Sequence, residues 1–436
     1  MNIRPFEIFL IGIFAVAAIA GLVYFSTYKP AQKAEETLYG SSVEIWGTLD
    51  RRIMDDYLTA LTQSQKALRV VRYTQIDKRS FQYELLNAIA EGRSPDLVIM
   101  PSSLLVTYRS KLQVIPFDTM SERTFRDTYI DGADIFMRSD GIYGLPIAVD
   151  PLVMYWNRDI FSASGIATPP KTWETLVSQT TNAINKTDNS RNLIQSTVAF
   201  GEYSNVTHAK NILSMLLLQA GSDIVSEQND GRYKVTFDQN AYQGLPPGHA
   251  VLSFYSQFAH PGNNSYSWNR SKSVDRTEFL NGDLALYFGM GSEKKTLDRD
   301  NANLNYDVAT VPQGGGSTVH RDYGDFYALA IPRASKNIAG AYAAAIYLTD
   351  PAQAQSFAEV FNFAPTQRGL YKGNTLDPYR NVLYQSALIA HGWLDPDPDK
   401  SNSVFQDMVE ETLANQSGIG KFVIDGREKL ESLFGK

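Results

Sequence analysis

The sequence predicts an α/β protein in which a mostly parallel sheet is flanked by helices, and two observations lead to this prediction. Strand-like and helix-like segments alternate between residues 43 and 100, which is the pattern of parallel strands joined by helical crossovers. The chain has 436 residues, of which 43% are hydrophobic, so two or three domains with large cores are expected. Ligands of such sheets gather at the carboxyl ends of the strands, where we therefore expect a site.

The alternation can be followed through the first hundred residues. Ile53, Tyr57 and Leu61 recur every four residues, which is the spacing of an amphipathic helix covering one face of a sheet. A second helical segment stops at Gly92, a residue type that often terminates helices. The predicted order is strand, helix, strand, helix and strand over residues 43–46, 53–61, 68–73, 81–89 and 95–100.

A long extended segment follows in the middle of the chain. Residues 147–156 are largely apolar and rich in β-prone types, as expected of a buried strand. Pro169 and Pro170 then prevent helix formation up to that point, and Thr172 is placed to cap a helix that begins at Trp173. This stretch therefore predicts a strand, a loop and a helix in succession.

Composition argues against several kinds of protein. The net charge of −7, without a dense cluster of Lys and Arg, argues against a nucleic-acid partner. The chain has no cysteine, so disulfides, thiolate nucleophiles, Cys-ligated metals and a lipid anchor on an N-terminal cysteine are impossible. Its five histidines lack the spacing of metal ligands. We therefore expect neither a metal nor a cofactor.

The N-terminus is expected to meet a membrane. Residues 8–25 are uncharged and largely apolar, and as a helix they would rise about 27 Å, close to the thickness of a bilayer core. Ala18-Ile-Ala20 fits the pattern of a signal-peptide cleavage site, but the apolar run continues beyond it. A transmembrane anchor or uncleaved signal within residues 1–28 is therefore favoured over a cleaved signal peptide. Residues 29–42 would form a polar linker to the fold.

Several segments resemble, in order, those of a known family. Residues 141–157, Gly-Ile-Tyr-Gly-Leu-Pro-Ile-Ala-Val-Asp-Pro-Leu-Val-Met-Tyr-Trp-Asn, resemble the central segment of the family 1 extracellular solute-binding proteins of ABC importers, the maltose-binding-protein-like group. Residues 95–102, 279–292 and 324–332 resemble further strands of that family. No single segment is diagnostic, and the order and spacing of all of them carry the resemblance.

The resemblance implies a two-lobe clamshell of the type II periplasmic-binding-protein kind, with lobes that are discontinuous in sequence. Residues 43–147 and 326–364 would form the first lobe, and residues 150–324 and 366–436 the second. The chain would cross between the lobes near Val149, Asp325 and Pro365. Closure would then move the lobes as rigid bodies, and a ligand would favour the closed form only as far as it binds that form better.

The implied function is that of the substrate-binding subunit of an ABC importer, tethered at the extracytoplasmic face of a bacterial membrane and performing no chemistry. Its partners would be a small solute, an ABC permease and the membrane. A saccharide is the favoured solute because aromatic rings and carboxylates suit the apolar faces and hydroxyls of sugars. Two alternatives stay open: a glycoside-processing enzyme, which also needs paired carboxylates, and a ligand sensor that keeps the clamshell.

Strand ends and the resemblance together nominate the ligand-binding residues. Trp46 would offer a ring for stacking and Asp50 a carboxylate, although a packed ring and a helix N-cap are the alternatives. In relatives a tryptophan often follows a Gly-Ser pair, but here Glu293 stands in that place. The rings that could replace it are Phe326, Tyr327 and Trp393. The full candidate set is Trp46, Asp50, Ser102, Ser103, Asp150, Tyr155, Tyr203, Ser292, Asp325, Phe326 and Trp393.

Overall fold

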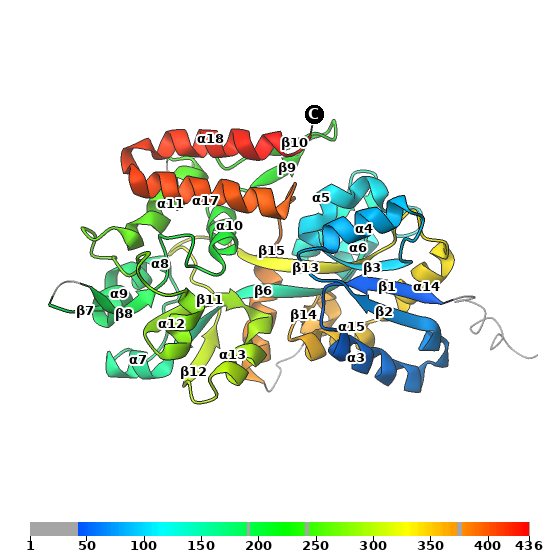
Figure 1. The fold of residues 1–436 in the computed structure, drawn as a ribbon, viewed down its shortest axis with the longest axis horizontal. Helices are drawn as coiled ribbons and strands as arrows, with labels where there is room; N and C mark the ends of the chain where they lie inside the picture. The colour runs from blue at the N-terminus through cyan, green and yellow to red at the C-terminus, as the bar shows by residue number, and fades with distance from the viewer. Residues whose placement is uncertain (1–41, 190–191, 240–243, 373–376, 436) are drawn as a thin grey trace, which may run out of the picture.

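The structure is a computed structural model that describes residues 42–189, 192–239, 244–372 and 377–435. Figure 1 shows two lobes side by side, each with helices packed around strands, and strands in the middle that pass from one lobe to the other. The predicted α/β class and two-lobe clamshell are confirmed. The sheet as a whole is mixed, because the strands that pass between the lobes run antiparallel to their neighbours.

The first lobe is built on three parallel strands in the order β2, β1, β3. β1 (Val43–Gly47) and β3 (Leu97–Pro101) lie where the sequence predicts strands. The strand predicted from residue 68 instead begins with a 3-10 turn, and β2 (Val71–Gln75) starts three residues later. The other elements here are η1 (Lys66–Val70), α3 (Arg51–Ser64), α4 (Phe81–Ala90), η2 (Ser102–Leu104), α5 (Leu105–Tyr108), η3 (Arg109–Lys111), α6 (Glu122–Thr128), η4 (Asp131–Phe136), β4 (Met137–Arg138), β5 (Gly141–Ile142), α14 (Ile338–Leu348) and α15 (Pro351–Phe361).

Three strands connect the lobes, and two of them pair with the third. β6 (Leu145–Asn157) is a single strand that enters both lobes, and β13 (Asp322–Ala330) and β14 (Ala364–Pro365) run antiparallel to it on either side. The register places Val149 opposite both Phe326 and Ala364, and Asp150 opposite Asp325. The three crossings expected near residues 149, 325 and 365 therefore meet in one ladder.

The second lobe continues the sheet beyond β6. β11 (Leu284–Met290) lies between β6 and β8 (Leu193–Val198), antiparallel to the first and parallel to the second. α10 (Ala209–Gln219) is buried along most of its length. The other elements here are α7 (Arg158–Ala163), α8 (Trp173–Thr175), η5 (Leu176–Thr180), α9 (Thr181–Ile184), β7 (Lys186–Thr187), β9 (Val225–Glu227), β10 (Tyr233–Val235), α11 (Pro247–Ser256), η6 (Gln257–Ala259), α12 (Asp275–Asn281), η7 (Gly291–Glu293), α13 (Lys294–Asp300) and β12 (Tyr306–Ala309).

The last part of the chain returns to both lobes. α17 (Pro398–Ala414) and α18 (Ile419–Ser432) lie side by side over α11 at the outer edge of the second lobe (Figure 1). Before them, α16 (Pro378–Ile389) packs on β6 and β13, and β15 (Ala390–His391) pairs with β13. The remaining turns are η8 (Arg368–Tyr371) and η9 (Gln416–Gly418).

The predicted membrane segment, residues 8–25, lies outside the described residues. Within residues 42–435, as far as the structure describes them, no helix combines the length and the apolar character needed to cross a bilayer.

Candidate functional site

The candidate site begins where β6 and β13 run together between the lobes. Asp150 on β6 and Asp325 on β13 are direct partners in the ladder, so their side chains leave the sheet on the same face. Ser292, which follows β11, donates two hydrogen bonds to Asp150. The backbone amide reaches Oδ1 at 2.9 Å and the hydroxyl reaches Oδ2 at 2.6 Å. Three predicted site residues from three strands are thus placed together.

Asp150 is almost enclosed, with 4% of its surface exposed. Burial raises its pKa to about 7, the negative charges of Asp325 and Glu293 act in the same direction, and the two hydrogen bonds from Ser292 oppose them. The carboxyl group therefore changes its protonation state close to neutral pH. It can accept a hydrogen bond when ionised and donate one when protonated, and both forms suit a hydroxyl group.

Glu293 and His208 form a half-buried pair in the turn after β11. His208 Nε2 lies 2.6 Å from its Oε1, the Tyr287 hydroxyl donates to Oε2 at 2.7 Å, and the Met290 amide donates to Oε1 at 2.8 Å. Burial raises the pKa of Glu293, but the hydrogen bonds from His208 and Tyr287 bring it below its ordinary value. Burial lowers the pKa of His208, and Glu293 raises it above its ordinary value. Both shifts favour the charged forms of the two side chains, and the hydrogen bonds hold the turn after β11 in place.

Two tyrosines share the sheet face of Asp325. Tyr323 lies two residues earlier on the strand and donates its hydroxyl to Asp325 Oδ1 at 2.6 Å. Tyr327 lies two residues later, and its ring stacks on Phe363 at 5.1 Å between centroids. Burial, reinforced by the charge of Asp325, raises the pKa of both phenols well above the ordinary value. Neutral phenols beside carboxylates provide donors together with apolar ring faces.

Ser102 lies beside Gly392, the residue before Trp393. Ser102 is buried at the end of β3, and a Cβ at Gly392 would come within 3.1 Å of its hydroxyl. Trp393 donates its indole N–H to Ser214 at 3.1 Å, and Lys210 Nζ lies 5.3 Å from the ring centroid. With 4% of its surface exposed, Trp393 is packed against α10. Ser103, the next residue after Ser102, is partly exposed.

Trp46, Asp50 and Tyr203 make bonds within their own lobes. The Trp46 indole donates to Glu44 Oε1 at 2.7 Å and the ring is partly exposed at the end of β1. Asp50 accepts from the Ile53 amide at 3.0 Å, which makes it the N-cap of α3, the alternative that the sequence left open. The Tyr203 hydroxyl donates to the Asn402 backbone oxygen at 3.0 Å, which ties this loop to α17.

Tyr155 and Phe326 have no exposed surface. The Tyr155 hydroxyl donates to the carbonyls of Met290 at 2.8 Å and Gly291 at 3.1 Å, so it supports the turn that presents Ser292. Phe326 points to the sheet face opposite Asp325, because neighbouring residues of a strand alternate, and a Cβ at Gly132 would come within 2.3 Å of its ring. Both rings belong to the core here, and neither presents a surface to a ligand in this conformation.

Some polar residues near the predicted site residues were absent from the predicted set. They are His208, Lys210, Tyr323 and Tyr379. Lys210 pairs with the buried Asp395 at 2.5 Å, and the Tyr379 hydroxyl donates to the Gly291 carbonyl. Tyr323 could have been found from its two-residue spacing to Asp325 on a predicted strand. The other three come from distant parts of the chain, and local spacing gives no signal for them.

A cavity of about 510 Å³ also lies between the lobes. It includes Arg138 from the first lobe, Glu227 from the second, and Arg321 beside His391. Arg321 Nη1 lies 2.9 Å from His391 Nε2, and burial together with the charge of Arg321 lowers the pKa of this histidine. In the part of the chain that the structure describes, no group of three or more His, Asp or Glu side chains is placed to hold a metal ion.

The chain also matches a known family of binding proteins. The family described as bacterial extracellular solute-binding protein matches residues 57–386, well over half of the chain. The chain belongs to this family. Because the family is extracellular, this solute-binding protein is located outside the cytoplasm. Curated relatives include binding proteins of Brucella abortus (strain 2308) and Brucella suis biovar 1 (strain 1330), each 32% identical over 94 residues. That match spans 21% of this chain and only 23% of each relative.

Solved structures share the fold at low sequence identity. An ABC transporter solute-binding protein of Thermotoga lettingae bound with α-D-tagatose has a TM-score of 0.65 at 20% identity, covering 91% of this solute-binding protein and 100% of that chain. A cyclo/maltodextrin-binding protein complexed with maltotetraose has a TM-score of 0.69 at 15% identity over 89% and 96%. The acarbose-binding GacH receptor of Streptomyces glaucescens has a TM-score of 0.68 at 16% identity over 90% and 98%.

Proposed function

We propose that this solute-binding protein captures a saccharide between its lobes and delivers it to an ABC permease. The observation that carries the proposal is the placement of Asp150 and Asp325 opposite each other on two strands that join the lobes, with Ser292 of the second lobe bonded to Asp150. A ligand that contacts this place touches both lobes and their connection at once, so its binding is coupled to their relative orientation. The tagatose, maltotetraose and acarbose bound by the three similar structures support a saccharide.

Each proposed contact has a definite chemical role. Asp150 and Asp325 would accept hydrogen bonds from sugar hydroxyls, and the partly exposed Tyr327 and Trp46 would cover apolar sugar faces. Ser102, Ser103 and Tyr203 would contribute through the loops at the strand ends. Tyr155, Phe326 and Trp393 would act beneath the surface, by fixing the turns that carry the contacts.

The proposed lobes are residues 43–147 with 326–364, and residues 150–324 with 366–436. The pairing of Val149 with both Phe326 and Ala364 supports a hinge at the three crossings, because rotation there would leave the sheet of each lobe intact.

Residues 8–25 would tether the protein to the outer face of the membrane, and residues 29–42 would be the linker that lets it reach the permease. Expressing the full chain and separating membranes from soluble material tests the tether. A chain found only in the soluble fraction, with its N-terminus removed, would contradict it.

Binding to saccharides tests the proposal directly. The full-length chain is screened by thermal shift and calorimetry against tagatose, maltotetraose, acarbose and other oligosaccharides. A ligand at 100 times its Kd should stabilise the fold by about 2.7 kcal/mol. Asp150→Ala and Trp46→Ala should reduce this stabilisation, whereas Asp407→Ala, on the outward side of α17, should not. If both site variants bind as tightly as the parent, the site is elsewhere.

A glycoside-processing enzyme remains the second candidate, because Asp150 combines a raised pKa with a neighbouring carboxylate. Binding alone is favoured because the family that the chain matches and the similar solved structures are described as binding proteins. Chromatography of any bound oligosaccharide after long incubation separates the two. Release of shorter sugars that Asp150→Asn abolishes would establish hydrolysis.

A further inference from the structure

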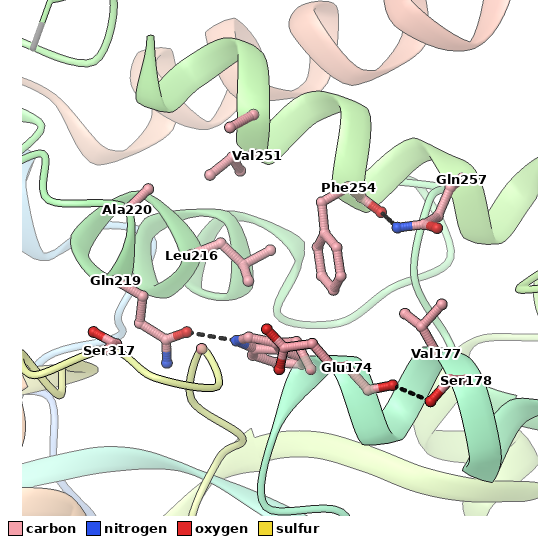
Figure 2. Close-up of a pocket in the computed structure, with 13 residues that line it drawn as sticks. Glu174, Val177, Ser178, Leu216, Gln219, Ala220, Val251, Phe254, Gln257 and Ser317 are labelled. Atoms are coloured by element: carbon pink, nitrogen blue, oxygen red, sulfur yellow. Dashed lines mark hydrogen bonds between the residues drawn. The ribbon is translucent and has the colours of Figure 1, made fainter. Parts of the chain in front are cut away.

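The second lobe contains a separate cavity of about 600 Å³, a size typical of small-molecule sites. Figure 2 shows it between three elements: Glu174, Val177 and Ser178 lie on one side, Val251 and Phe254 on α11 lie on the other, and Leu216 lies between them on α10. The lining residues all fall between positions 173 and 317. The cavity is therefore distinct from the site between the lobes.

The walls of this cavity are mostly apolar, and the side-chain amides of its two glutamines already make hydrogen bonds within the protein. Trp173 donates its indole N–H to Gln219 Oε1 at 2.6 Å, and Gln219 donates through Nε2 to the carbonyls of Pro312 at 3.1 Å and Arg321 at 3.0 Å. Gln257 likewise donates to the Phe254 carbonyl at 2.9 Å. The ring of Phe254 packs edge-on against Trp173 at 5.5 Å. An occupant would therefore be held chiefly by apolar and ring contacts.

Glu174 supplies the single charge among the thirteen lining residues. Its side chain is exposed, and both carboxylate oxygens take their hydrogen bond from the same backbone amide, that of Gly315, at 3.1 and 3.0 Å. A carboxylate accepts more hydrogen bonds than this one amide provides. The charge at the mouth of the cavity therefore favours a cationic group over a neutral or anionic one.

One wall is formed by an unusual backbone. The turn η5 is a π-helix inserted between α8 and α9, and it carries Val177 and Ser178 to the cavity. The Leu176 carbonyl accepts both the backbone amide and the hydroxyl of Thr181, five residues later, the hydroxyl at 2.8 Å. Single π-helical turns are rare in proteins, and those that occur are often found at functional sites.

We propose that this cavity is a second binding site, for a small molecule that joins an apolar ring system to a cationic group. The rings of Trp173 and Phe254 hold the ring system, and Glu174 pairs with the cation at the mouth. The site is independent of the saccharide site, so either proposal can fail without the other.

Three probes with the same ring test the proposal: 1-naphthylmethylamine, 1-naphthalenemethanol and 1-naphthoate. Titrated calorimetrically into the full-length chain, the amine should bind about fivefold more tightly than the alcohol, as expected of one partly exposed ion pair, and the naphthoate more weakly than either. Because the chain has no cysteine, Val177→Cys creates a single thiol in the wall. The amine should protect that thiol from a maleimide.

Two variants separate charge from shape. Glu174→Gln keeps the acceptor for Gly315 and removes the charge, so it should abolish the preference for the amine while leaving the affinity for the alcohol unchanged. Ala250→Leu adds bulk to the wall and should eliminate binding of both, whereas Ala352→Leu, on an exposed turn of α15, should not. A saccharide bound between the lobes should bind all three variants equally.

The proposal is overturned if the probes neither release heat nor protect the thiol, if the alcohol binds as tightly as the amine, or if Glu174→Gln keeps the preference. Even if Ala250→Leu fails to fold, thiol protection in the Val177→Cys protein shows whether the amine occupies the cavity.

Discussion

The position of Asp150 between the lobes has two opposing consequences. A carboxylate on the connecting strands is well placed to sense a ligand from both lobes, but enclosing it disfavours its charged form and raises its pKa to about 7 from 3.8. The folded state therefore holds a proton on Asp150 at pH values where the unfolded chain does not. Between pH 4 and 7 this residue makes the fold progressively less stable as the pH rises.

Asp150→Asn should remove that pH dependence. The two pKa values differ by about 3, so at 1.36 kcal/mol per unit the stability of the variant relative to the parent should rise by up to about 4 kcal/mol between pH 4 and pH 8. The measurement is urea unfolding of both proteins at each pH. An Asn can keep both contacts with Ser292, so packing stays matched. A difference that is the same at both pH values would show that Asp150 is ionised throughout.

His208 depends on Glu293 for its charge. Burial lowers the pKa of His208, but Glu293, with smaller contributions from Asp275 and Asp325, raises it above its ordinary value, so Glu293→Gln should lower it. The titration of His208 is followed by NMR, with the exposed His260 as an internal reference. The stabilisation from charged His208 is complete below pH 6.5 and is lost as the pH rises through the higher folded value. An unchanged His208 titration in the variant would contradict the pair.

At the level of elements, the β9–β10 hairpin reaches across from the second lobe to the first. Glu227 on β9 pairs with Arg109 at 2.5 Å and with Arg138 at 3.5 Å. Arg109 also donates a hydrogen bond to the hydroxyl of Tyr233 on β10 at 3.0 Å. The side chains of Arg109 and Arg138 are 19% and 15% exposed, and that of Glu227 is 11% exposed. Removing Glu227 takes from both arginines their carboxylate partner in the second lobe, while Arg109 keeps Asp140 at 2.9 Å within the first lobe.

Glu227→Ala should therefore loosen the arrangement of the lobes without unfolding either of them. We expect a broader distribution of interatomic distances in small-angle X-ray scattering, with far-ultraviolet circular dichroism unchanged. Asp230→Asn is the matched control, because Asp230 lies on the same hairpin and pairs with Arg232 inside the second lobe. Identical scattering from Glu227→Ala and the parent would mean that the hairpin does not hold the lobes.

Elements with strong local periodicity were predictable, and those fixed by distant contacts were less so. α3 follows from the spacing of Tyr57 and Leu61, whereas the start of β2 was misplaced because a 3-10 turn and a strand draw on the same apolar residues. The placement of Asp150 opposite Asp325 rests on pairing across distant sequence. The family resemblance suggested that both residues lie near the crossings, but no local pattern encodes their pairing. Phe326 was proposed for the site, but strand alternation turns it into the core.

On the scale of the whole molecule, the two lobes share strands, so their relative motion is confined to the few residues where those strands cross. Each lobe keeps its own sheet and helices through such a motion, and the crossing residues take up the change in backbone angles. A ligand can shift the balance between arrangements only by the difference in its affinity for them. Closure should therefore be measurable as a change in one distance between two rigid bodies.

Tyr83 on α4 of the first lobe and Ile424 on α18 of the second are exposed by 71% and 47%, so both tolerate a dye. In a chain without cysteine, Tyr83→Cys with Ile424→Cys gives two unique attachment points for single-molecule fluorescence transfer. A saccharide that stabilises the fold should move the population to a second transfer efficiency, and Asp150→Ala should require more ligand for the same shift. Tyr83→Cys paired with Ile346→Cys, within the first lobe, should not respond. A saccharide that binds tightly while leaving the between-lobe distance unchanged would separate binding from closure, and would remove the physical link between occupancy and recognition by a permease.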